Sequence, residues 1–315
     1  MIAAKPRLAE YDRSLGRVAL APAQVRRPRV SFEIMPPKME EAKSDLWRVV
    51  CALAPLGPSF VSVTHGAGGV TRQGAFGTTL RLLAQTRLKP APHLTCIGAT
   101  REEIRDLICD YWIMGVRHVV AVRGDEPRAM GAAVHPQKDS FANATELVHA
   151  ITRIAAFDVT VACYPEKHPQ SPSFDHDIDV LKAKIDAGAT RAISQMFFDV
   201  ETFLRFEDRV RKAGVFIPIV PGVMPVASLQ GLARTARRCG ASIPRWLVSR
   251  LEGFDDQPGA RHLIAATLAA EMCEGLTRRG FEDLHLFTFN HADLVVTVSR
   301  LLGLQNQAAE NDAVG

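Results

Sequence analysis

The sequence predicts one (β/α)8 barrel, a TIM barrel, with extra helices before the last strand. Short β-rich apolar runs alternate with longer helical patterns from residue 29 to residue 303. The runs are apolar throughout, which is typical of parallel strands covered by helices on the outside. The span also fits the ~250 residues usual for this barrel.

A doubly wound open sheet is the alternative fold. Such a sheet usually has about six strands and carries a glycine-rich phosphate-binding turn. The nearest candidate here, Gly66-Ala-Gly68-Gly69-Val-Thr71, lacks the third glycine of a G-x-G-x-x-G motif, and there is no Walker A sequence. The barrel is therefore the better prediction.

The first four strands are followed by clear helix signals. In chain order, these strands are predicted at residues 29–35, 60–64, 93–97 and 118–122. Pro36 and Pro37 end the first strand, and a helix is expected over residues 40–53. A second helix ends near Arg87. Thr100 and Glu103 form a capping-box pattern, which predicts that another helix begins there.

The last four strands are predicted at residues 159–164, 192–198, 217–225 and 284–289. Prolines interrupt the seventh, so it should be short. Extra helices are expected within residues 243–279, and the final helix should end near Leu302. The predicted domains are an N-terminal extension at 1–28, partly helical or disordered, the catalytic barrel at 29–303 and a disordered tail at 304–315.

Composition excludes several classes of protein. The net charge of +4, from 38 basic and 34 acidic side chains, is too small and dispersed to indicate nucleic-acid binding. No run reaches the ~18 apolar residues of a membrane span, and the N-terminus does not resemble a secretory signal. The six cysteines form no Cys-x-x-Cys pair, so we expect reduced core residues of a cytoplasmic protein and no structural zinc.

Polar residues gather where the predicted strands end. In a TIM barrel this end carries the chemistry, because the loops after the strands meet there. The residues expected at this site are Glu33, Thr64, His65, His93, Thr95, Arg123, Asp125, Tyr164, His168, Gln195, Asn290 and His291.

Glu33 is the most informative of these residues. Its sequence neighbours Phe32, Ile34 and Met35 are apolar, so its pKa is expected to be raised by desolvation, as suits a general acid. A carboxylate in a salt bridge at the barrel rim is an equally good interpretation of the sequence.

The other polar positions also allow two interpretations. Arg123 and Asp125 flank Gly124, so they could approach a bound ring or simply pair in a turn. Tyr164 and His168 could hold a planar ring or a phosphate, although a lone histidine is more often structural. Asp177 and Lys184, on one predicted helix, would ordinarily be read as a solvated face. No ligand spacing for a catalytic metal is present, so none is expected.

The whole pattern resembles the methylenetetrahydrofolate reductase family. The similar segments occur in the family's order and span most of the chain. They are Ser31–Pro37 (SFEIMPP), Phe60–Gly66 (FVSVTHG), Ala91–Cys96 (APHLTC), Arg117–Asp125 (RHVVAVRGD), Tyr164–Pro169 (YPEKHP), Asp186–Ala189 (DAGA), Gln195–Asp199 (QMFFD) and Pro221–Pro225 (PGVMP). The resemblance is to the short bacterial form, without a C-terminal regulatory domain.

This resemblance implies an oxidoreductase of one-carbon metabolism that holds FAD non-covalently. It would take hydride from NADH or NADPH and reduce 5,10-methylenetetrahydrofolate, by a ping-pong mechanism, to the methyl donor used in methionine synthesis. Glu33 matches the family's general acid, and Asp125 matches the acid that contacts the pterin and tunes the flavin.

The resemblance also implies binding positions. The FAD-contacting positions are Thr64, His65, Ala67, His93, Arg123, Gly124, Asp125, Phe141, Ala142, Tyr164, His168, Asp177 and Lys184. The substrate-binding positions are Asp125, Gln195, Phe287 and His291. The partners implied are these small molecules and further copies of the chain, with neither nucleic acid nor membrane.

Three positions depart from the family pattern near the folate. His291 stands where close bacterial relatives have an arginine for the glutamate tail, Thr235 where a phenylalanine stacks on the aminobenzoate, and Gly231 where there is a glutamine. The sequence does not choose between NADH and NADPH. Two other functions remain open: a flavin-free lyase or aldolase with a lysine Schiff base, which needs an inner strand-end lysine not found here, and a folate-binding scaffold without catalysis.

Overall fold

The computed structural model describes residues 27–37, 43–65, 71–124, 139–254 and 256–304. Residues 1–26 of the N-terminal extension and 305–315 of the tail lie outside these ranges. So do two residues predicted for the site, Ala67 and Asp125.

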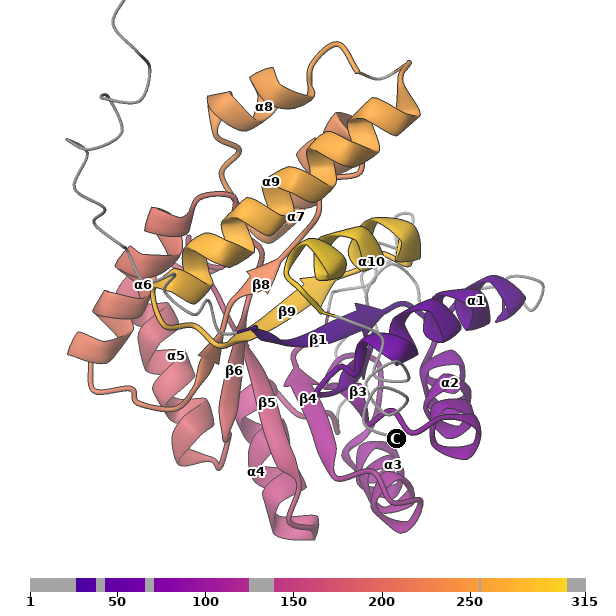
Figure 1. The fold of residues 1–315 in the computed structure, drawn as a ribbon. Coiled ribbons are helices and arrows are strands. Elements are labelled where there is room, and N and C mark those ends of the chain that lie inside the picture. The colour runs from indigo at the N-terminus through magenta and orange to yellow at the C-terminus, as the bar shows by residue number, and fades with distance from the viewer. Residues whose placement is uncertain (1–26, 38–42, 66–70, 125–138, 255, 305–315) are drawn as a thin grey trace, which may run out of the picture.

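Within the described residues, nine short parallel strands form one sheet that curves into a nearly closed barrel (Figure 1). They are β1 (Arg29–Ile34), β2 (Val61–Val63), β3 (Pro90–Thr95), β4 (His118–Val122), β5 (Asp158–Cys163), β6 (Arg191–Ser194), β7 (Ile219–Val220), β8 (Gly222–Val223) and β9 (Asp283–Phe287). From β1 to β7 each strand pairs with the next in chain order, and β9 pairs with β1.

The seventh predicted strand is split at Pro221, and its two halves close the barrel. β7 pairs with β6 and β8 pairs with β9. The carbonyl of Pro221 accepts the His285 N–H at 2.9 Å, and the Gly222 N–H donates to Ser194 Oγ at 2.8 Å. The predicted eight-unit barrel is therefore confirmed, with two very short strands at the seventh position.

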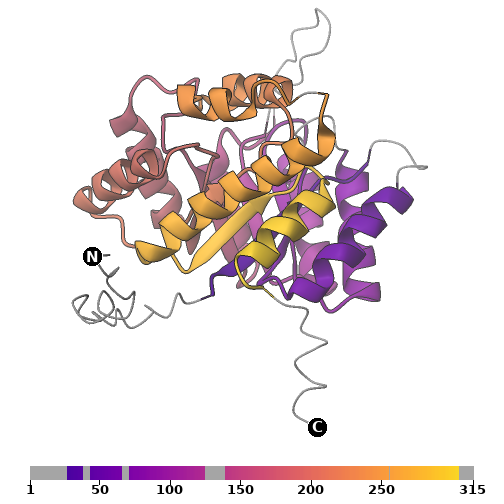
Figure 2. The same ribbon diagram turned by 45° about the horizontal axis from the view of Figure 1, so that its top comes forward.

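Helices cover the outside of this barrel. They are α1 (Lys43–Leu53), α2 (Arg72–Gln85), α3 (Arg101–Ile113), α4 (Ala144–Ile154), α5 (Phe174–Asp186), α6 (Val200–Lys212), α7 (Leu229–Cys239), α8 (Arg245–Leu251), α9 (Pro258–Arg278) and α10 (Ala292–Leu301). The predicted extra helices are α8 and α9; in Figure 1, α9 runs along the barrel, and α8 and the adjoining end of α9 project beyond it. Figure 2 shows α9 and α10 side by side over β9. None of the described helices is both long and apolar enough to cross a membrane.

Local sequence signals set several boundaries. The Thr100 hydroxyl accepts the Glu103 N–H at 3.1 Å and Glu103 Oε2 accepts the Thr100 N–H at 2.8 Å, which confirms the capping box. β3 begins at Pro90 rather than at the predicted His93. Its first residues pair only with β2, and pairing with β4 starts at His93, so the prolines interrupt no ladder on that side.

Among the described residues, three buried apolar clusters form the core, and two of them line the two faces of the barrel wall. Alternate strand residues such as Phe32 and Ile34 are fully buried beneath the helices. Phe60, Val120 and Ile193 belong to a smaller cluster inside the barrel. All six cysteines are free, but Cys51 and Cys109 are exposed on α1 and α3, so the prediction that the cysteines are core residues is wrong for these two.

Candidate active site

A cavity of about 980 Å³ lies at the carboxyl ends of the strands. Its floor includes Val120, Ile193 and Phe287, which belong to or pack on the cluster inside the barrel. The residues predicted for the site that line it are Glu33, Thr64, His65, His93, Arg123, Gly124, Tyr164, His168, Asp177, Lys184, Gln195 and Phe287. The prediction that the site lies where the strands end therefore led to this cavity, because side chains from strands far apart in the sequence converge here.

Glu33 points into the cavity from β1. Its Oε2 lies 3.5 Å from His93 Nε2 and 4.0 Å from His285 Nε2. Its neighbours Phe32 and Ile34 point the other way, beneath the helices, because successive side chains of a strand face opposite sides of the sheet.

The expectation that Glu33 has a raised pKa is wrong for this arrangement. Burial raises the pKa of Glu33, but interaction with His285 and the positive charge of His93 outweigh burial and lower it below its usual 4.5. The apolar residues that motivated the prediction lie outside the barrel wall. The residues that face Glu33 are polar, so the site favours the carboxylate.

Ser31 and His285 were not among the predicted site residues. The Ser31 Oγ lies 2.8 Å from His285 Nδ1 and 3.2 Å from the Leu284 carbonyl oxygen, so it forms hydrogen bonds with both. The ring of His285 thereby has its Nδ1 beside Ser31 and its Nε2 facing Glu33. A sequence signal existed, because Ser31 and His285 occupy alternate positions of β1 and β9 that share a face with Glu33 and Phe287.

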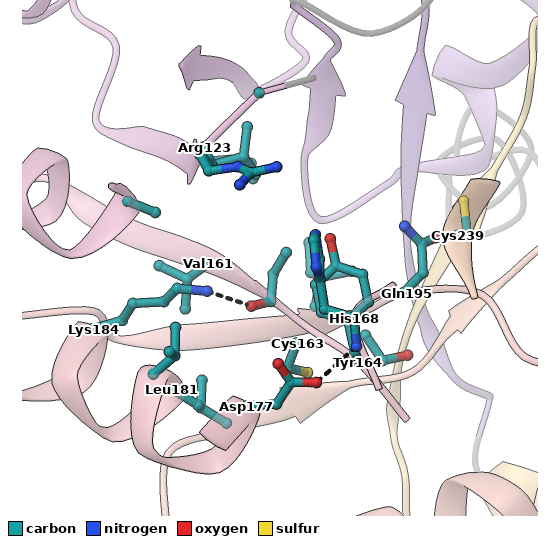
Figure 3. Close-up of a pocket in the computed structure, with 18 of the residues that line it drawn as sticks. Arg123, Val161, Cys163, Tyr164, His168, Asp177, Leu181, Lys184, Gln195 and Cys239 are labelled. Atoms are coloured by element: carbon teal, nitrogen blue, oxygen red, sulfur yellow. Dashed lines mark hydrogen bonds between the residues drawn. The ribbon is translucent and has the colours of Figure 1, made fainter. Parts of the chain in front are cut away.

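A basic and polar wall faces the cavity from β4, β5 and α5 (Figure 3). The Arg123 guanidinium donates to the Gln170 side chain. The His168 N–H donates to Asp177 Oδ2 at 2.7 Å, and the His168 and Tyr164 rings meet edge to face at 4.7 Å. These contacts fix the loop after β5 against the start of α5.

Lys184 belongs to the same wall. Its side chain is 9% exposed and its Nζ donates to the Ala162 carbonyl at 3.0 Å, as Figure 3 shows. Burial lowers the pKa of this lysine, since the ammonium has lost water. The interpretation of Asp177 and Lys184 as a solvated face is therefore wrong. Position on a helix alone does not reveal which stripe faces a cavity.

A family model described as methylenetetrahydrofolate reductase matches residues 20–303. The chain belongs to the methylenetetrahydrofolate reductase family. The family resemblance of the sequence is thereby confirmed.

Individual relatives agree with this membership. Proteins named 5,10-methylenetetrahydrofolate reductase from Pectobacterium carotovorum subsp. carotovorum and Escherichia coli (strain K12) are 40% identical over 283 residues and 41% identical over 276 residues. These alignments cover 90% and 88% of this chain, and 93% and 91% of the two relatives.

A solved structure is similar in fold. It is titled "Uncharacterized protein from Clostridium thermocellum binds two copies of 5-methyl-5,6,7,8-tetrahydrofolic acid" and has a TM-score of 0.60 at 14% identity. The match covers 87% of this chain and 95% of that one, and it supports the barrel fold only.

Not every position implied by the methylenetetrahydrofolate reductase family lies on the cavity wall. The Phe141 ring is buried in the core beneath the Arg101 guanidinium, 4.7 Å away. The Ala142 N–H donates to Glu146, which does line the cavity. His291 is exposed at the start of α10. Binding roles for these three residues remain predictions.

The three departures from the family pattern fall on α7 and at the start of α10. Thr235 lines the cavity, and Gly231 lies one turn earlier on the same helix. Among the described residues, no group of three His, Cys, Asp or Glu side chains is arranged to hold a metal ion.

Proposed function

We propose that the chain reduces 5,10-methylenetetrahydrofolate to 5-methyltetrahydrofolate, with FAD bound non-covalently and NADH or NADPH as the hydride donor. The observation that carries this proposal is the position of Glu33, which faces His93 and His285 at the base of a cavity of about 980 Å³. A cavity at the upper end of the range for small-molecule sites suits a flavin together with a second aromatic substrate.

The residues on the α5 side of the cavity fit FAD. Arg123 and Lys184 provide the positive charge that a dianionic pyrophosphate requires. Within the described residues, the Lys184 Nζ donates to the Ala162 carbonyl, and the burial of this ammonium makes an anionic partner favourable. When bound, FAD supplies the hydride chemistry, while the protein supplies position and charge.

Glu33 is the proton donor in this proposal. It protonates N10 of the folate, so that the five-membered ring opens and exposes the carbon to be reduced. Its lowered pKa means that the open cavity holds a carboxylate at neutral pH. Covering the cavity with flat, apolar ring systems removes water and shifts the pKa of Glu33 upward, since desolvation disfavours the charged form.

His285 supports this role by its position next to Glu33. Its Nδ1 is held by the Ser31 hydroxyl and its Nε2 faces Glu33, so the imidazole and the carboxyl group can exchange a proton. Gln195, at the end of β6, contacts each substrate in turn in this scheme. Asp125 is the second acid, assigned from the family resemblance alone.

A lysine Schiff-base lyase is the rival that the structure makes worth testing, because Lys184 is a buried lysine on the cavity wall. However, Lys184 comes from α5 rather than a strand end, and its Nζ is directed at a backbone carbonyl. Borohydride in the presence of a carbonyl substrate would leave a covalent adduct on Lys184 if the rival were right.

The proposal is tested with the purified holoprotein. The FAD is reduced anaerobically with NADH or NADPH and then mixed with methylenetetrahydrofolate while flavin absorbance is followed. Reoxidation together with formation of 5-methyltetrahydrofolate supports the proposal. A protein without FAD, or one whose reduced flavin ignores the folate, refutes it and leaves the folate-binding scaffold.

The setting of this reaction is also part of the proposal. Six free cysteines fit a reducing cytoplasm. We expect a homo-oligomer, which sedimentation of the holoprotein would test.

A further inference from the structure

Ser31 and His285 form a buried pair next to Glu33. Ser31 of β1 pairs in register with His285 of β9, and the two residues are 2% and 1% exposed. His285 lines the cavity, whereas Ser31 is not among the residues of the cavity wall. Ser31 therefore does not touch a molecule bound there, and any effect that it has on the reaction passes through His285.

Two aromatic rings fix the plane of the His285 ring. The Phe60 ring is stacked on it, with an interplanar angle of 17° and 5.8 Å between the ring centroids, and the Phe287 ring meets it edge to face at 5.3 Å. An imidazole turned by 180° about its bond to Cβ has nearly the same shape, so these contacts accept both orientations. In one orientation Nε2 faces Glu33. In the other, the carbon atom Cε1 takes its place.

The hydrogen bond to Ser31 selects one of these two orientations. Ser31 Oγ lies 2.8 Å from His285 Nδ1, and turning the ring would put a carbon atom there and break this bond. The bond therefore keeps Nε2 on the side of Glu33, 4.0 Å from Oε2. A serine hydroxyl both donates and accepts, so it can hold Nδ1 whether or not that nitrogen carries a proton. The orientation of the ring thus survives a change in its protonation.

Glu33 needs a proton before it can act as an acid, because the open cavity holds it as a carboxylate. Of the described titratable side chains, His93 and His285 face this carboxylate, with their Nε2 atoms 3.5 Å and 4.0 Å from Oε2. A movement of the carboxylate by about 1 Å brings Oε2 to hydrogen-bond distance from His285 Nε2. An imidazole held in this orientation can therefore pass a proton to Glu33.

We propose that Ser31 is a positioning residue, which keeps Nε2 of His285 directed at Glu33 so that the imidazole supplies the proton that Glu33 passes to the folate. The inference rests on the proposed function, which provides the folate. The imidazolium gives its Nε2 proton to the Glu33 carboxylate and becomes neutral. Glu33 then gives a proton to N10 as the bond from N10 to the one-carbon unit breaks, and the bonding electron pair stays on N10. Water protonates the imidazole again once the product has left.

The test measures the two half-reactions separately in holoproteins of the wild type, S31A, S31T, H285Q and S31A/H285Q. The FAD is reduced by NADH or NADPH in one rapid-mixing experiment and reoxidised by methylenetetrahydrofolate in the other. S299A is the matched control, because Ser299 is a buried serine of α10 that does not line the cavity. Urea midpoints and FAD content show whether each variant is folded and loaded.

S31A should slow reoxidation by the folate about three- to tenfold, the usual contribution of one hydrogen bond, and leave flavin reduction unchanged. S31T should restore most of the rate, because threonine keeps the hydroxyl group and suits a strand. H285Q should be at least as slow as S31A. S31A/H285Q should be no slower than H285Q, since Ser31 acts only through the imidazole. S299A should match the wild type in both half-reactions.

Three results overturn the inference. One is reoxidation of S31A at the wild-type rate. Another is an equal loss from S31A in the wild-type and H285Q backgrounds, which would show that Ser31 does not act through His285. The third is a loss in both half-reactions that S31T does not restore, which would give Ser31 a structural role only. If the reduced flavin of the wild type does not react with the folate at all, the proposed function is wrong and the inference falls with it.

Discussion

Gly222 offers a sharp test of how the barrel closes. A Cβ at this position would lie 2.2 Å from the Ser194 carbonyl oxygen and 2.6 Å from Cε2 of the Phe287 ring. Ser194 O belongs to the backbone of β6 and cannot rotate away, so β8 or the Phe287 ring must move. Overpacking of this kind costs about 1–3 kcal/mol, and the backbone contact puts Gly222→Ala at about 3 kcal/mol.

Urea denaturation measures this cost. With an m-value of about 3 kcal/mol/M, the midpoint should fall by about 1 M while m stays constant. FAD content should fall as well, because Phe287 forms part of the cavity floor. The control is Gly77→Ala on an exposed turn of α2, where an added Cβ meets nothing within 4 Å. That helix should gain up to about 1 kcal/mol. A Gly222→Ala protein with the wild-type midpoint and FAD content would refute this account of barrel closure.

Three further predictions concern charge in the barrel. Burial lowers the pKa of His118 from its ordinary 6.5 to about 4. As pH falls from 6.5 to about 4, His118 is therefore protonated in the unfolded chain before it is protonated in the folded protein. The free energy of unfolding should drop by up to about 3 kcal/mol over this pH range. The urea midpoint of His118→Asn should fall less over the same range than that of the wild type. Lys184→Met should weaken FAD binding about 10- to 100-fold by removing a charged donor, without destabilising the FAD-free protein; an unchanged Kd would exclude the lysine from the cofactor site. Because the pKa of Glu33 is lowered in the open cavity, kcat/KM for the folate should rise as pH falls from neutral, whereas reduction by nicotinamide should not follow this group.

Much of the site could be predicted because the carboxyl ends of all strands in a parallel barrel lie at the same end of the barrel. Glu33, His93, Arg123 and Gln195 are far apart in sequence, yet all four line the cavity. The alternation of strands and helices in the sequence was enough to predict that these residues lie together. Capping at Thr100 was also predictable, since it depends only on local contacts.

The wrong predictions concern properties set by residues that face each other in the fold, not by neighbours in the sequence. The environment of Glu33 is set by His93 and His285 on neighbouring strands, not by Phe32 and Ile34 next to it in sequence. Lys184 looked solvated because a helical pattern does not show which stripe meets a cavity. Strand six ends at Ser194, short of its predicted end at residue 198, because the chain turns there towards α6.

The central claim is that Glu33 donates the proton when the reduced flavin reduces the folate. Glu33 takes no part in the reduction of the flavin by NADH or NADPH. Rapid mixing of Glu33→Gln holoprotein tests it directly, with one mixing experiment for each half-reaction. The account predicts that NADH or NADPH still reduces the flavin at nearly the wild-type rate, while reoxidation by methylenetetrahydrofolate slows by about 10²- to 10⁴-fold, the usual contribution of a general acid. Equal slowing of both half-reactions, or unimpaired reoxidation, would contradict it.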